Sequence, residues 1–167
     1  MNTVTFQGNG LHLEGELPVQ GGKAPDFALA ANDLSPRSLK DYAGKVLVLV
    51  SVPSLDTPVC DLEVRRFNAE AAALSDKVRI VAVSCDLPFA QARWCGAAGV
   101  KAVETLSDYK DTSFGRNYGV LIQELRLLAR AVFVVAPDGV LAYSQLVPEV
   151  TSEPDYDAAL AAVKKLI

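Results

Sequence analysis

Three stretches of the chain are almost entirely apolar and rich in β-branched residues: 46–50, 78–83 and 131–136. Runs of this kind are typical of strands that are covered on both faces, as in α/β proteins. We therefore expect these three stretches to form the centre of one β-sheet.

Helical patterns lie between these strands. Thr57 is a favourable N-cap and Pro58 fits the first helical position, and apolar residues then recur every three or four positions. This apolar face consists of Cys60, Val64, Phe67, Ala71 and Leu74. Pro88 is predicted to begin a second helix, which Gly99 ends.

Turn-forming residues place hairpins near both ends of the chain. The β-like runs 3–7 and 11–14 are joined by residues 8–10, whose sequence Gly-Asn-Gly accepts positive φ. A Pro-Asp-Gly turn at 137–139 is followed by a further strand at 140–146. Both hairpins are expected to extend or flank the central sheet.

The remaining segments complete the predicted arrangement. Residues 17–26 are expected to form a loop, 27–31 a short strand and 32–36 a turn. A last helix is expected over 152–167, with one apolar face made of Tyr156, Leu160, Val163 and Ile167. This order predicts a three-layer α/β fold, in which helices flank a central mixed sheet and a β-hairpin is added at the N-terminus.

Length and composition limit the class of protein. At 167 residues the chain fits one domain, 1–167. Its 16 basic and 20 acidic side chains give a net charge of −4, so no basic surface for nucleic acid is expected. No apolar run is long enough to cross a membrane, and the N-terminus lacks a secretory pattern. We therefore expect a cytoplasmic protein, in which a disulfide would usually be catalytic or redox-sensing.

Cys60 is the most informative candidate for chemistry. It is the third residue of the first predicted helix, where free backbone N–H groups and the helix dipole favour a thiolate. It also follows a strand, and α/β proteins place their sites beyond the carboxyl ends of strands. A buried cysteine on the apolar face would have the same position, so both interpretations remain open.

Other polar and sulfur-containing residues carry weaker signals. Cys85 and Cys95 could each meet Cys60 in space or be small core residues. Together with His12 they would make a Cys3His set, but separations of 25 and 10 residues between the cysteines are unlike structural zinc sites. His12 alternates with leucines, which is typical of a surface strand, and a Cys–His hydrolase would need it near Cys60. No glycine-rich nucleotide motif is present, so no cofactor is expected.

Arg130 precedes the apolar run 131–136. An arginine at a strand end is usually solvated or ion-paired, but a fixed positive charge could also stabilise a thiolate and a developing oxyanion. The sequence alone does not pair Arg130 with Cys60.

Three segments resemble one protein family. Residues 53–60 (PSLDTPVC) match the P-x-x-x-T-x-x-C pattern of peroxiredoxins, and DTPVC is similar to their thiol peroxidase branch, an atypical two-cysteine group. Residues 86–95 (DLPFAQARWC) resemble that branch's D-L-P-F-A-Q-x-R-F-C segment, and 128–134 (LARAVFV) match its arginine-bearing strand. The opening hairpin and residues 22–27 (GKAPDF) are also similar, so the resemblance covers essentially the whole chain.

This resemblance implies a fold, an activity and roles for individual residues. It implies a thioredoxin-like fold, peroxide substrates including alkyl hydroperoxides, reduction by thioredoxin and a homodimer. Cys60 would be the peroxidatic cysteine and Cys95 the resolving one. Pro53 would shield the site, Thr57 would hydrogen-bond the thiolate and the peroxide, and Arg130 would hold both.

Two residues depart from the family pattern. Trp94 stands where the branch usually has phenylalanine, a change expected to matter little for the chemistry. Cys85 stands where a small residue is usual, which leaves open whether Cys95 is the exclusive resolving thiol. The alternative to an enzyme is a redox sensor on the same fold, whose disulfide would signal oxidation to a partner; catalytic turnover of peroxide separates the two.

Overall fold

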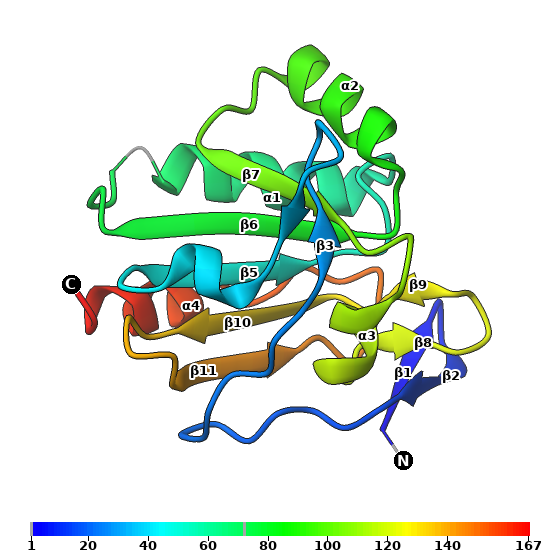
Figure 1. Ribbon diagram of the computed structural model, residues 1–167. Helices are drawn as coiled ribbons and strands as arrows, with labels where there is room; N and C mark the ends of the chain where they lie inside the picture. The colour runs from blue at the N-terminus through cyan, green and yellow to red at the C-terminus, as the bar shows by residue number, and fades with distance from the viewer. Residues whose placement is uncertain (1, 72) are drawn as a thin grey trace.

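The computed structural model describes residues 2–71 and 73–167 (Figure 1). The side chain of Ala71, which the pattern places on the apolar face of the first helix, lies outside the described part. The strands are β1 (Thr3–Phe6), β2 (Asn9–Glu14), β3 (Leu29–Ala30), β4 (Pro36–Arg37), β5 (Val46–Ser51), β6 (Val78–Ser84), β7 (Val103–Ser107), β8 (Leu121–Ile122), β9 (Leu127–Leu128), β10 (Ala131–Val135) and β11 (Leu141–Leu146). The helices are the 3-10 helix η1 (Leu39–Tyr42) and the α-helices α1 (Pro58–Ala71), α2 (Pro88–Ala98), α3 (Ser113–Asn117) and α4 (Tyr156–Lys164).

A mixed sheet of seven strands forms the centre of the molecule. Its order is β11-β10-β5-β6-β7-β3-β4, with β5, β6 and β7 parallel and β10 antiparallel to β5. A smaller antiparallel sheet, ordered β1-β2-β8-β9, contains the N-terminal hairpin. The predicted α/β fold, with a mixed central sheet and an added hairpin, is therefore confirmed.

The central strand β5 is buried along its whole length, as its apolar sequence predicts. Because alternate side chains of a strand point to opposite faces, β5 contributes to two apolar clusters. Val46, Val48 and Val50 pack on the face covered by α1 and α4, whereas Leu47 and Leu49 pack on the other face. In Figure 1, α1 and α4 lie behind the large sheet and α3 lies in front of it.

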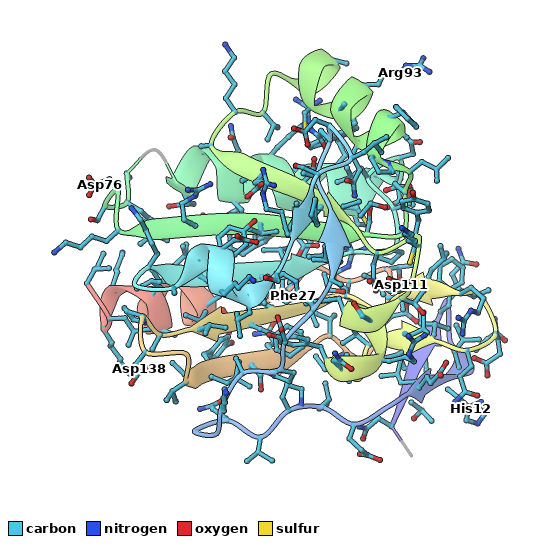
Figure 2. The ribbon with its side chains drawn as sticks, viewed as in Figure 1. His12, Phe27, Asp76, Arg93, Asp111 and Asp138 are labelled. Atoms are coloured by element: carbon cyan, nitrogen blue, oxygen red, sulfur yellow. The ribbon has the colours of Figure 1, made fainter. Side chains whose placement is uncertain are left out.

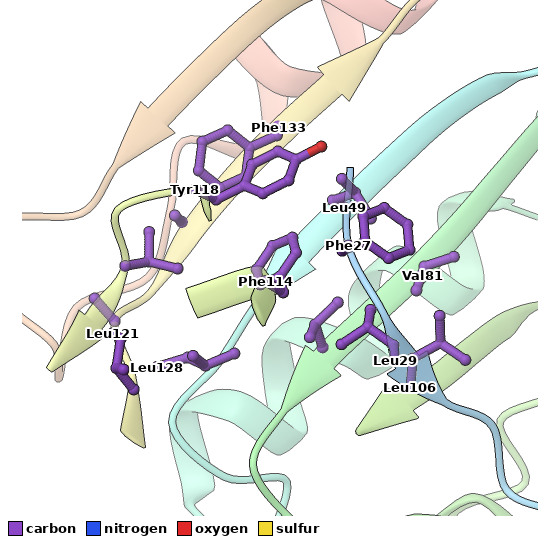
Figure 3. Close-up of a cluster of buried hydrophobic side chains, with 14 of the residues drawn as sticks. Phe27, Leu29, Leu49, Val81, Leu106, Phe114, Tyr118, Leu121, Leu128 and Phe133 are labelled. Carbon is purple, nitrogen blue, oxygen red and sulfur yellow. The ribbon is translucent and has the colours of Figure 1, made fainter. Parts of the chain in front are cut away.

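The front cluster contains most of the buried aromatic rings (Figure 3). Phe114 and Tyr118 of the α3 region stack with ring centroids 4.5 Å apart, and Tyr118 meets Phe133 of β10 edge-on at 5.0 Å. Phe27 adds a fourth ring, 6.1 Å from Phe114. These contacts fix the segment around α3 against the sheet.

The N-terminal hairpin turns earlier than the sequence predicts. β1 and β2 are joined by Gln7 and Gly8, which have φ of 51° and 84°, so Asn9 and Gly10 already pair as strand residues. A two-residue turn with positive φ fits the right-handed twist of paired strands better than a three-residue link. The carboxylate of Glu149 accepts the backbone N–H groups of Gln7 and Gly8 at 3.2 and 3.0 Å and stabilises this turn.

Three predicted elements are clearly shorter than expected. The first helix, α1, ends at Ala71, so Leu74 lies beyond it. The strand predicted over 27–31 is reduced to the two residues of β3. The helix predicted over 152–167 covers only α4, because Asp155 is its N-cap and accepts the N–H of Ala158 at 3.0 Å. Ile167 therefore lies beyond the helix and is 49% exposed, instead of completing its apolar face.

The apolar pattern does not predict β7. Its sequence, VETLS, carries a glutamate within a strand that pairs with the buried β6. Glu104 is tolerated there because the Tyr42 hydroxyl donates to it at 2.6 Å and the guanidinium groups of Arg37 and Arg79 lie within 3.4 and 3.7 Å. These partners come from distant segments, so the sequence pattern alone does not reveal them.

Candidate active site

Cys60 lies in the first turn of α1, as its distance from Thr57 and Pro58 predicts. α1 begins at Pro58, directly after the loop that leaves the carboxyl end of β5. The side chain of Cys60 is fully buried and belongs to the apolar cluster behind the sheet. Burial alone fits a core cysteine, so its polar neighbours decide what the residue can do.

Arg130 is the polar neighbour that distinguishes Cys60. It immediately precedes β10, whose first residue, Ala131, pairs with Ser51 at the end of β5, and this pairing brings Arg130 to the start of α1. The guanidinium is only 2% exposed, and its Nη2 donates to the Sγ of Cys60 at 3.2 Å. Its Nε donates to the carbonyl of Val150 at 3.0 Å, which fixes its orientation. Arg130 is thus a buried cation directed at a thiol and not a surface ion pair.

Glu63 completes this cluster and was not singled out by the sequence analysis. It lies three residues after Cys60, on the same face of α1, and its buried carboxylate accepts a hydrogen bond from Nη1 of Arg130. Burial raises the pKa of the Glu63 carboxyl to about 7, although the Arg130 guanidinium lowers it. The signal in the sequence is an acidic residue within an otherwise apolar helix face. Arg130 is therefore shared between a thiol and a carboxyl group.

Asp86 fixes the loop that carries the first turn of α1. Its carboxylate accepts the Ser54 hydroxyl at 2.7 Å, the backbone N–H of Leu55 at 2.8 Å and the Ser84 hydroxyl at 2.7 Å. Asp86 follows β6 and precedes α2, so one carboxylate connects the loop before α1 with the start of α2. The sequence places Asp86 in a motif but does not reveal this contact.

Thr57 and Pro53 lie in the same loop. Pro53 is buried, and the Thr57 hydroxyl donates to the carbonyl of Ser54 at 2.9 Å instead of contacting Cys60. A groove of about 380 Å³ passes over this loop. Its lining residues are Leu55, Asp56, Thr57, Pro58, Asp61, Arg65, Trp94, Ala97 and Ala98. The groove gives a small molecule a place to approach the first turn of α1.

Cys95 lies on α2 and faces a different environment. Its Sγ is 3.4 Å from the hydroxyl of Thr105, which in turn donates to the side chain of Asn32 at 3.0 Å. Cys95 also lines a separate cavity of about 330 Å³, on the side of α2 that faces β7. Cys60 and Cys95 are both free thiols in this structure, and their recorded partners differ.

Cys85 sits at the end of β6 in an environment that suppresses reactivity. Burial, together with the carboxylates of Asp108 and Asp86, raises the pKa of the Cys85 thiol to about 12. A thiol with such a pKa is almost wholly protonated at neutral pH, and the thiolate is the reactive form.

We therefore expect the substitution Cys85→Ala to leave the peroxide turnover that the family resemblance implies within about twofold, because it changes little volume at a site away from Cys60. Steady-state rates with a fixed peroxide concentration measure this directly. Mass mapping of the oxidised protein provides the second check: a Cys60–Cys85 bridge would contradict the expectation.

His12 takes no part in this cluster. It lies on the exposed surface of the molecule (Figure 2), with its Nδ1 2.6 Å from the carboxylate of Glu124. Arg130, and not an imidazole, contacts Cys60. Within 2–71 and 73–167, no three His, Cys, Asp or Glu side chains are grouped so that they could hold a metal ion. Among the described helices, none combines the length and apolar character needed to cross a membrane.

A larger cavity, of about 530 Å³, lies at the other end of the sheet. It is lined by Leu47, at the beginning of β5, and by Val135, at the end of the antiparallel β10. Cys60 follows the opposite end of β5, so this cavity is not part of the cysteine–arginine cluster. The volume of a cavity therefore does not identify the candidate active site. The buried guanidinium beside Cys60 is the feature that marks it.

Comparisons with known proteins identify the family of the chain. Residues 19–160 match the family model described as Redoxin. A thiol peroxidase of Staphylococcus aureus is 51% identical over 166 residues, covering 99% of this chain and 100% of that protein, and one of Bacillus subtilis is 50% identical over 167 residues, covering 100% and 99%. The crystal structure of a peroxiredoxin-like protein from Aquifex aeolicus superimposes with a TM-score of 0.93 at 40% identity, covering 100% of this chain and 98% of that one. The chain therefore belongs to the redoxin family and, within it, to the thiol peroxidases of the peroxiredoxin group.

Proposed function

We propose that this protein is a thiol-dependent peroxidase that reduces hydrogen peroxide and alkyl hydroperoxides and is recycled by thioredoxin. The observation that carries the proposal is the buried guanidinium of Arg130, which donates to the Sγ of Cys60 at 3.2 Å in the first turn of α1. The family supports the class of activity.

In the first step the Cys60 thiolate attacks the terminal oxygen of the peroxide. The S–O bond forms as the O–O bond breaks, and the departing oxygen takes up a proton and leaves as an alcohol or water. Cys60 is oxidised to a sulfenic acid, and the peroxide is reduced by two electrons. Arg130 holds the thiolate and can follow the negative charge onto the departing oxygen, because its guanidinium carries several donors in one plane.

Thiolate formation alone does not account for a specialised peroxidase. A lower thiol pKa increases the thiolate fraction but reduces the nucleophilicity of that thiolate, so the net gain is only a few-fold. Donors directed at the breaking O–O bond contribute more, about 3–4 kcal/mol for one well-placed group. Arg130 and the N–H groups of the first turn of α1 are such donors, and Thr57 would become one if its hydroxyl turned away from Ser54.

In the second step Cys95 resolves the sulfenic acid. Its sulfur attacks the Sγ of Cys60, the S–S bond forms, the S–O bond breaks, and hydroxide leaves with the proton of the second thiol as water. An external dithiol then reduces the disulfide by exchange and is itself oxidised. We assign the external reductant to thioredoxin, the protein to the cytoplasm and the functional form to a homodimer, on the strength of the family resemblance.

A coupled assay tests this function. Turnover of hydrogen peroxide and cumene hydroperoxide is followed through the oxidation of NADPH by thioredoxin reductase and thioredoxin. Many turnovers for each protein molecule would support the enzyme, and the ratio of the two rates would give its preference. Oxidation of only one equivalent, with no turnover, would instead support a redox sensor and overturn the proposal.

We expect the proposed disulfide to require movement of α2. Cys95 faces Thr105, and only Pro88 and Gln91 of α2 are buried, so the helix is held by few apolar contacts. A disulfide needs the two Cα atoms within about 7 Å and a suitable orientation of the Cβ atoms. We expect hydrogen exchange of residues 88–99 to become about tenfold or more faster on oxidation, and to return to its first rate on reduction. Equal exchange in both states, measured by mass spectrometry, would mean that the two cysteines meet without unfolding of the helix.

A further inference from the structure

A hydrogen bond between two side chains joins the helix that carries Cys95 to the helix that carries Cys60. The indole Nε1–H of Trp94 donates to Oδ1 of Asp61 at 2.9 Å. Trp94 is the only tryptophan of the chain and is half-buried between the two helices. A phenylalanine could fill much of the same space but has no N–H to donate.

The side chain of Arg65 contacts both helices beside this hydrogen bond. Its Nε donates to Oδ2 of Asp61 at 3.0 Å, and its Nη1 donates to the carbonyl of Ala98, the last residue of α2, at 3.3 Å. The guanidinium carbon also lies 5.9 Å from the centre of the Trp94 ring. Asp61, Arg65 and Trp94 therefore form a small network between α1 and α2, which we call the interhelix latch.

The position of the latch couples it to both cysteines. Asp61 directly follows Cys60, and Trp94 directly precedes Cys95. The recorded partner of the Cys95 sulfur is Thr105 and not Cys60, so we expect α2 to turn or unfold before the two sulfurs can bond. Either movement separates the indole from Asp61. The latch is one of the few side-chain contacts that hold α2 in place, beside the two hydrogen bonds that the buried Gln91 donates to the Ser84 hydroxyl and the Leu106 carbonyl.

We propose that the interhelix latch is a positioning device that slows closure of the Cys60–Cys95 disulfide and so sets how long Cys60 remains a sulfenic acid. This inference rests on the proposed function, because it needs the sulfenic acid to form. Trp94 and Asp61 line the groove beside the first turn of α1, but neither has a recorded hydrogen bond to the sulfur of Cys60 or Cys95; in this proposal they act through the position of α2.

Two reactions compete for the sulfenic acid. Attack by Cys95 forms the S–S bond and releases water. A second peroxide molecule instead transfers an oxygen to Cys60, its O–O bond breaks, an alcohol or water leaves, and a sulfinic acid forms that thiols do not reduce. Slower closure therefore makes the protein more sensitive to inactivation by excess peroxide.

The substitution Trp94→Phe tests the latch with little change in shape. A hydrogen bond to a charged acceptor at a half-exposed site corresponds to about a 3- to 10-fold change in an opening equilibrium. We expect closure to become faster by about that factor, and the peroxide concentration that inactivates half of the protein to rise by the same factor. Closure is measured after one equivalent of peroxide, by acid quenching and intact mass.

Variants of Asp61 supply the matched comparison. Asp61→Asn keeps an oxygen that can accept from the indole, whereas Asp61→Ala removes it, so closure should be close to normal in the first and faster in the second. The double variant Trp94→Phe with Asp61→Ala should close no faster than either single variant, because both remove the same bond. Arg93→Gln on the same helix is the control, since Arg93 points away from the body of the molecule (Figure 2). In the unaltered protein, a change in tryptophan fluorescence should accompany closure with the same rate.

The outcomes separate the latch from the proposed function. If the unaltered protein forms a Cys60–Cys95 disulfide and Trp94→Phe forms it at the same rate, the proposed role of the latch is refuted and the proposed peroxidase function is unaffected. If the unaltered protein forms no such disulfide, the proposed mechanism fails first. Faster closure in Trp94→Phe and Asp61→Ala, but not in Arg93→Gln, supports the latch.

Discussion

Substitution of Cys60 by serine is expected to reduce peroxide turnover by about 10⁴-fold or more, to the level of the uncatalysed reaction. A serine hydroxyl is not ionised at neutral pH and does not form a reducible oxidised state, so both steps of the cycle are lost. The fold should survive, because oxygen replaces sulfur at a buried position and can still accept the hydrogen bond of Arg130. The coupled assay gives the rate, and a thermal unfolding curve shows whether the structure is intact.

The matched variant is Cys95→Ser, which should keep the first step and lose the second. Given one equivalent of peroxide, it should consume it rapidly, form a Cys60 sulfenic acid that a dimedone probe labels, and form no disulfide. Cys60→Ser should consume none. Substantial turnover in folded Cys60→Ser would show that another thiol is the peroxidatic one.

The sequence predicts the centre of the fold well because the signals there are local. The continuous apolar sequence of β5 requires burial on both faces, and Thr57-Pro58 and Gly99 mark helix ends through their own backbone preferences. Elements that are stabilised by distant partners cannot be predicted from such local signals. β7 contains Glu104, a charged residue that is stable in this strand because Tyr42 and Arg79 lie beside its carboxylate.

The same distinction applies to the candidate site. The position of Cys60 in the first turn of a helix follows from neighbouring residues. The burial of Arg130 does not, because it depends on the pairing of Ala131 with Ser51, which are 80 residues apart in the chain. The roles of Glu63 and Asp86 likewise appear only when their partners are known. The sequence also gives no reason to expect that Trp94 binds Asp61, although its difference from the family pattern marks the position.

The substitution Arg130→Met is expected to lower kcat/KM by about 10²- to 10³-fold, the usual effect of losing one donor to a developing negative charge. It should also destabilise the protein, because Glu63 remains buried without its cation. Breaking a buried ion pair by removing one partner typically costs about 3–5 kcal/mol. One substitution would thus reduce activity through two different causes, and they need to be separated.

The pH dependence of stability separates them. Burial already raises the pKa of Glu63 from its ordinary 4.5 to about 7, and Arg130 is the group that lowers it, so Arg130→Met should raise it further. A carboxyl whose pKa is raised by folding favours the unfolded state as pH increases from 4.5 through the raised value. The variant should therefore lose most of its stability at pH 8 and little at pH 5, as measured by urea unfolding. The double variant Arg130→Met with Glu63→Gln carries neither the buried guanidinium nor the buried carboxyl group, so its stability should recover and vary little over this range. Its peroxidase activity should remain as low as that of Arg130→Met, because the donor beside Cys60 is still absent. Recovery of activity in the double variant would instead show that Arg130 serves only to neutralise Glu63.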